Sequence, residues 1–228
     1  MASERRRDAP RISVNKLGEY LTATPARRRQ IIQDQKYPPT FKCVRYRDAE
    51  KALVDCLVAG LNPNVLHTHR ARLAGTQPAT EFEQDTLSLC IQAIDCFEDM
   101  LDSLDIDGLK LEAGSNDAAP LDVAGVSISV RPELIVTGQD KARPRAGCFK
   151  LYFAKNGPLD ITTGPIVATV MSQFAEEYLA SLGRVDNRLV RVIDVFAGQV
   201  FEAPKARTRR LENVAAACEE IAARWPSV

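Results

Sequence analysis

Residues 127–155 read "SISVRPELIVTGQDKARPRAGCFKLYFAK". An alternating apolar run is followed by a segment rich in Gly, Pro and charge, and then by a second apolar run. This pattern predicts two strands joined as a β-hairpin. The first run carries a carboxylate, Glu133, and the second an ammonium, Lys150. Because an unpaired charge is costly to bury, these two residues raise the question of a functional site.

Helical periodicity surrounds this hairpin. The predicted helices cover residues 12–21, 26–36, 48–60, 81–104, 164–183 and 206–225, and a second hairpin covers 188–203. The order of elements predicts an α+β fold, an α/β sandwich in which helices flank a small mixed central sheet built from two hairpins. We expect a disordered basic tail over residues 1–10, a helical lobe over 11–120 and an α/β core over 121–228, with lobe and core forming one continuous domain.

The composition is that of an ordinary globular protein, with 45% hydrophobic and 26% charged residues in 228. No stretch approaches the roughly 20 apolar residues of a membrane span, and no apolar segment follows the charged N-terminus, so we expect no membrane interaction and a cytoplasmic location. The six cysteines are widely spaced and form no Cys-x-x-Cys pair. Neither disulfides nor structural zinc are expected.

Charge is unevenly distributed although the net charge is zero. Residues 1–51 hold thirteen basic and six acidic residues, whereas residues 80–122 hold twelve acidic residues and one lysine. One interpretation is a basic face that meets phosphate and an acidic face that meets a protein; the other is that both are solvated or neutralise each other within the fold. The residues predicted to bind nucleic acid are Arg27, Arg28, Arg29, Lys36, Arg45 and Arg47.

Four stretches resemble the RecB-like branch of the PD-(D/E)XK nuclease superfamily. They are "ISVNKLGEYL" with the basic "ARRRQII" after it, "VRPELIV", "GCFKLYFAK" and "SQFAEEYL". The resemblance implies that Glu133 is the metal-holding acid, that Lys150 is the motif lysine, and that Gln173 and Tyr178 match a Gln-x-x-x-Tyr helix.

The sequence departs from this family at three points. Cys148 stands where the motif has Asp or Glu, and Gln173 and Tyr178 are one residue further apart than the family pattern. The turn at Pro25 lacks the cysteine that would ligate an iron–sulfur cluster, so no such cluster is expected.

Metal-dependent phosphodiester hydrolysis needs carboxylates that hold Mg²⁺ or Mn²⁺, and a nearby lysine to offset developing charge. Glu133 and Lys150 supply one acid and one cation. Candidates for the second metal-binding carboxylate are Asp160, Glu176, Glu177, Glu81 and Glu83. The predicted metal ligands are Glu133, Asp160 and Glu177. The alternative is that Glu133 and Lys150 form an ion pair or point to solvent.

The sequence therefore predicts a protein that engages nucleic acid, either as a divergent Mg²⁺- or Mn²⁺-dependent nuclease or as a pseudonuclease that has lost cleavage. The alternative is a non-enzymatic interaction module whose acidic helix, residues 81–104, docks a basic protein partner.

Overall fold

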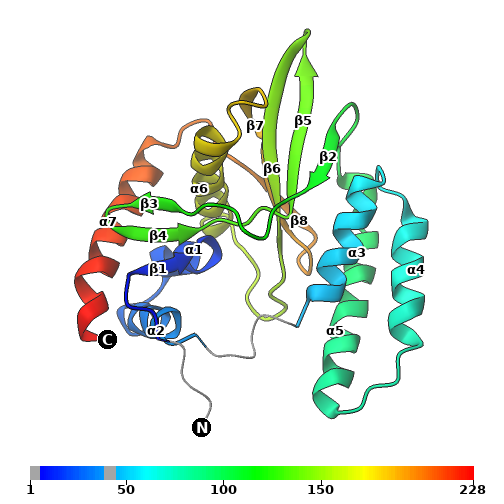
Figure 1. Ribbon diagram of the computed structural model, residues 1–228, viewed down its shortest axis with the longest axis horizontal. Helices are drawn as coiled ribbons and strands as arrows, with labels where there is room; N and C mark the ends of the chain where they lie inside the picture. Colours follow the sequence, from blue (N-terminus) through cyan, green and yellow to red (C-terminus); the bar gives the residue numbers. More distant parts are fainter. Residues whose placement is uncertain (1–5, 39–44) are drawn as a thin grey trace.

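A computed structural model describes residues 6–38 and 45–228 and contains a five-stranded sheet at its centre (Figure 1). The strand order is β2-β5-β6-β7-β8, and β6 and β7 are parallel whereas the other neighbours are antiparallel. The strands are β2 (Lys110–Ala113), β5 (Leu134–Asp140), β6 (Arg143–Tyr152), β7 (Arg184–Asp194) and β8 (Gln199–Glu202). Helix α6 (Thr163–Tyr178) makes the crossover that two parallel strands require.

A second, three-stranded sheet has the order β1-β4-β3. Its strands are β1 (Arg11–Ser13), β3 (Leu121–Val123) and β4 (Val126–Ser129), and β1 runs parallel to β4. The segment after β4 contains Pro132, which has no N–H to donate to a ladder, and the chain changes sheet there. The alternating run predicted as one strand is therefore two strands in two sheets.

Helices cover both faces of the central sheet (Figure 1). With α6, one face carries α1 (Val14–Thr22), α2 (Pro25–Lys36) and α7 (Thr208–Arg224), and the other carries α3 (Arg47–Val58), α4 (Pro63–Ala74) and α5 (Glu81–Glu98). Short 3₁₀ turns follow α5 and α7 at Leu101–Ser103 and Trp225–Ser227. Period-two alternation divides β6 between the two cores: Cys148 faces the first, whereas Phe149 and Leu151 face the second.

Two glycines permit close packing at the centre of this arrangement. A Cβ on Gly147 would lie 2.1 Å from the Leu189 carbonyl oxygen, at the register shift between β6 and β7. A Cβ on Gly18 would lie 2.7 Å from Val167, where α1 crosses α6. Any larger residue at Gly147 would separate the two parallel strands, because the group it meets is backbone.

The predicted fold class is confirmed: the protein is α+β, with helices in the N-terminal region and mixed sheets flanked by helices after it. The β5–β6 and β7–β8 hairpins are present, and β2 adds an edge strand that the sequence did not predict. Helix α4 was missed because Pro63 and Gly75 indicated an irregular segment, yet Pro63 begins the helix after an Asn62 cap and Gly75 ends it. The helix predicted to reach residue 104 ends at Glu98.

The helices of the predicted lobe over 11–120 pack into two different cores. Helices α1 and α2 pack with α6 and α7, whereas α3, α4 and α5 form the second core against the opposite face of the sheet. Of the predicted tail, residues 1–5 lie outside the described part of the chain. Arg7 is held against α2, since its backbone N–H donates to the Lys36 carbonyl at 2.9 Å.

No helix in the described ranges is long and apolar enough to cross a membrane.

Candidate functional site

Glu133 lies directly before β5, and its carboxylate reaches across to β6. Its backbone N–H donates to the Phe149 carbonyl at 3.0 Å, which fixes the start of the β5–β6 ladder. Oε2 accepts a hydrogen bond from the Leu151 backbone N–H at 2.6 Å, and Oε1 accepts one from Lys150 Nζ at 3.0 Å. Both carboxylate oxygens are therefore engaged by β6.

The Lys150 ammonium also has hydrogen-bond partners. Its Nζ donates to the Arg131 carbonyl at 2.8 Å as well as to Glu133, and its side chain is only 10% exposed. Glu133 and Lys150 lie together, which suits both a catalytic site and the alternative of an ion pair. Their contacts are those of a buried ion pair. Each charge is compensated by the other and by backbone groups, as burial requires.

A cleft of about 310 Å³ opens beside this pair, between α3, the loop after β2 and the segment before β5. Its basic lining residues are Arg47, Lys51 and Arg131, its acidic ones are Glu50, Asp55 and Glu133, and the loop contributes Ser115 and Asn116. Arg47 and Arg131 are exposed. Arg131 donates to Asn116 Oδ1 at 2.6 Å, so the loop holds this guanidinium in place. Charged groups of both signs thus face a shared hollow.

Glu50 is the residue that the sequence analysis missed. Burial raises the pKa of its carboxyl group, and the negative charge of Glu133 raises this pKa further, while the positive charge of Lys150 opposes the shift. The second acid near Glu133 therefore comes from α3 and was not among the candidates. Helical spacing within 47–58 places Arg47, Glu50 and Lys51 on one face, but nothing local connects that face with residue 133.

Cys148 does not replace the missing carboxylate. It is fully buried, and burial raises the pKa of its thiol to about 12. A thiol binds metal as the thiolate, which is scarcely populated at such a pKa. The described residues contain no group of three His, Cys, Asp or Glu side chains arranged to hold a metal ion.

The donors at the predicted metal site therefore do not fit a divalent cation as they are arranged. Both Glu133 oxygens are occupied, Cys148 is protonated, and the Lys150 ammonium lies where it would repel a second cation.

The other predicted catalytic and metal-binding residues are not among those that line the cleft. Asp160 Oδ1 accepts from the Thr162 and Thr163 backbone N–H groups, and these bonds lower the pKa of Asp160 at the start of α6. Tyr178 donates to the Pro120 carbonyl at 2.9 Å, and Glu177 beside it is exposed. Gln173 is half-buried on α6. These residues follow the motif closely in sequence. In the structure they lie on α6 or directly before it, and none of them lines the cleft.

The six predicted nucleic-acid-binding residues are dispersed, and only Arg47 lines the cleft. Arg27 pairs with Glu19 at 2.7 Å and Arg28 with Glu220 at 3.3 Å, whereas Arg29 is exposed. The Arg45 guanidinium lies over the Phe82 ring.

Lys36 has a structural position that does not suit phosphate contact. Its side chain is buried, and Nζ donates to the carbonyls of Trp225 and Val228 at 2.7 and 2.6 Å. It joins α2 to the turn after α7.

The acidic helix α5 is partly neutralised by α4. Asp95 pairs with Arg70 at 2.7 Å, and Glu98 lies 2.6 Å from His67. The compensating Arg70 belongs to α4, which lies outside the basic segment 1–51, so the two charged segments do not neutralise each other through this contact. Glu81, Glu83 and Asp85 on its first turns are exposed.

No protein-family model matches the chain, and a search of curated proteins found no significant relative.

Proposed function

We propose that this protein binds nucleic acid through the cleft between α3 and β5, as a PD-(D/E)XK-like pseudonuclease. The observation that carries the proposal is the placement of two exposed guanidinium groups, those of Arg47 and Arg131, beside the Glu133–Lys150 pair. Guanidinium groups form bidentate, charge-assisted hydrogen bonds with phosphate.

The order of elements supports the nuclease-like part of the proposal. Strands β2, β5 and β6 form an antiparallel run, α6 crosses over, and β7 returns parallel to β6. Glu133 precedes the second of these strands and Lys150 lies on the third, the positions that the sequence resemblance implies. The donor set supports the loss of cleavage, because the position of the motif acid holds a buried, protonated thiol.

Binding is tested by fluorescence anisotropy with labelled single-stranded and duplex DNA and RNA at low salt. We expect the wild-type protein to bind, and Arg47→Ala and Arg131→Ala each to weaken binding by roughly tenfold and to lower the salt dependence by about one phosphate contact. The matched control is Arg209→Ala, which removes an exposed arginine from α7. Equal weakening by all three variants, or no binding by the wild type, contradicts the proposal.

Retained phosphodiesterase activity, the other outcome that the sequence predicts, would need the Glu133 carboxylate to leave Lys150 and Leu151 and to hold a cation together with Glu50. The same nucleic acids are incubated with Mg²⁺ or Mn²⁺ and analysed for cleavage. Activity that both Glu50→Gln and Glu133→Gln abolish supports this candidate. Activity that survives both variants belongs to a contaminant or to another site.

The interaction-module alternative rests on the exposed acids Glu81, Glu83 and Asp85 at the start of α5. It gains support if the wild type neither binds nor cleaves any of these nucleic acids.

A further inference from the structure

The β5–β6 hairpin extends past both of its neighbours. Strand β2 pairs with β5 only over 134–137, and β7 pairs with β6 only from Arg145 onward. The end of the hairpin, residues 138–144, therefore projects from the body of the molecule (Figure 1). Its two turn residues, Lys141 and Ala142, have φ values of 46° and 64°. This left-handed pair is typical of the tight two-residue turn that matches the twist of a hairpin.

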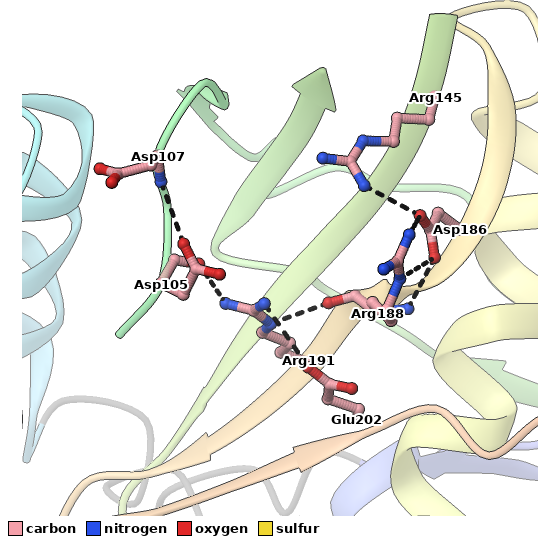
Figure 2. A network of polar contacts seen from close by, with 7 residues as sticks. All are labelled: Asp105, Asp107, Arg145, Asp186, Arg188, Arg191 and Glu202. Carbon is pink, nitrogen blue, oxygen red and sulfur yellow. Dashed lines mark hydrogen bonds and ion pairs between the residues drawn. The ribbon is translucent and has the colours of Figure 1, made fainter. Parts of the chain in front are cut away.

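Cations gather at this end of the sheet. Segments 140–145 and 184–188 contain five basic and two acidic residues. Asp186 accepts from Arg145 and from Arg188, each at 3.1 Å (Figure 2). In the described part of the chain no ion pair engages Lys141, Arg143 or Arg184, and all three are exposed. We call these three residues the basic tip.

The base of the hairpin is held in place by a polar network. Arg191 on β7 donates to the Arg188 carbonyl at 2.8 Å and to the Asp105 carbonyl at 2.6 Å (Figure 2), and its guanidinium lies over the Phe149 ring. Asp186 joins β6 to β7 through Arg145. These contacts fix the direction in which the basic tip projects.

Strand β5 connects the basic tip with the cleft. Glu133 lies directly before this strand of seven residues, and Lys141 follows its last residue. At about 3.3 Å per residue, this strand of seven residues is roughly 23 Å long. Duplex DNA rises about 3.4 Å per base pair, so this length corresponds to about seven base pairs.

We propose that the basic tip is a second phosphate-contacting surface, and that the ligand of the cleft is a nucleic-acid duplex of at least about seven base pairs rather than a nucleotide or short oligomer. This inference rests on the proposed function of the cleft. Asp140 is the only acidic side chain in the hairpin end, residues 138–144, and the three cations of the basic tip outnumber it. A duplex that follows β5 from the cleft meets the basic tip before it leaves the protein.

The experiment measures binding of a labelled 24-base-pair duplex and of a DNA hairpin with a four-base-pair stem, across a salt series. The variant is Lys141→Ala/Arg143→Ala, and the matched control is Lys205→Ala/Arg209→Ala, which removes two exposed cations near the start of α7. Circular dichroism and thermal melting verify that each variant is folded. We expect the tip variant to bind the long duplex roughly tenfold more weakly, with a salt slope lower by about two, and to bind the short stem as the wild type does.

The other possible results distinguish a failure of this inference from a failure of the proposed function. Wild-type affinity of the tip variant for the long duplex, or equal weakening by tip and control variants, overturns the inference and leaves the proposed function standing. Equal weakening for the long and short probes overturns the length requirement. Failure of the wild-type protein to bind either probe at low salt refutes the proposed function itself.

Discussion

Lys150 Nζ lies 3.0 Å from Glu133 Oε1, and the two side chains are only 10% and 11% exposed. Removing one partner of such a pair leaves the other charge buried without compensation. We expect Lys150→Met to lower the free energy of unfolding by about 3 kcal/mol. Glu133→Gln keeps an acceptor for the Leu151 N–H and is expected to cost less.

The double variant Glu133→Gln/Lys150→Met isolates the interaction energy between the two residues from the interactions of each residue with its surroundings. Because it removes both charges, its loss of stability should be smaller than the sum of the two single losses by about 1 kcal/mol or more. Urea denaturation of all four proteins at pH 7 measures this coupling. Strictly additive losses would mean that the two groups act independently of each other.

Glu50 makes stability depend on pH. Its pKa is raised by burial and by the charge of Glu133, so the stability linked to its protonation is fully present below the unfolded pKa of about 4.3 and is lost as pH rises through the folded pKa. Glu50→Gln removes this titration. We expect the variant to be more stable than the wild type at pH 8, with the difference shrinking toward pH 4.

Urea denaturation between pH 4 and pH 8 tests this expectation, with Glu212→Gln on α7 as a control that removes an exposed carboxylate. A difference between Glu50→Gln and wild type that grows toward low pH would have the opposite sign and would contradict the assigned cause.

Cys148→Asp tests whether the cleft derives from a metal-holding core. The new carboxylate would be buried beside Glu133 and Lys150, so we expect a loss of stability of about 3 kcal/mol without metal. A ligand that binds only the folded state restores stability in proportion to its affinity, and Mn²⁺ should therefore raise the melting temperature of this variant.

The control for this prediction is Cys148→Ser, whose melting temperature should not respond to Mn²⁺. An equal response of Cys148→Asp, Cys148→Ser and wild type would show that the ion binds elsewhere.

Lys36 is expected to contribute to stability and not to binding. Its Nζ donates two short hydrogen bonds to carbonyls after α7, and hydrogen bonds to charged groups contribute about 1.5–3 kcal/mol each. We expect Lys36→Met to lower the melting temperature while DNA affinity, measured by anisotropy below that temperature, stays within about twofold of wild type. A weakened affinity in a fully folded Lys36→Met protein would place this residue at the nucleic-acid surface after all.

Local patterns were sufficient to predict the β5–β6 hairpin, the β7–β8 hairpin and most of the helices. Period-two alternation sets which side chains share a face of a strand, and the turn at residues 138–144 brings Glu133 and Lys150 to adjacent strands. The contact between these two residues could therefore be anticipated from sequence. The missed helix α4 shows the limit of such patterns, because only Leu66 and Leu73 of its twelve residues are buried.

The composition of the cleft depended on contacts between distant segments. Glu50 and Arg47 share the cleft with Glu133 because α3 packs against β2, which pairs with β5, while Lys36, eleven residues before Arg47, contacts the turn after α7 in the other core. Charge and spacing did not distinguish these basic residues from one another. The sequence by itself determined the strands, the helices and the Glu133–Lys150 neighbourhood, because these follow from periodicity over a few residues. Only the tertiary structure decided that Glu50 and Arg47 join them, since that depends on which helix buries its apolar face beside β5.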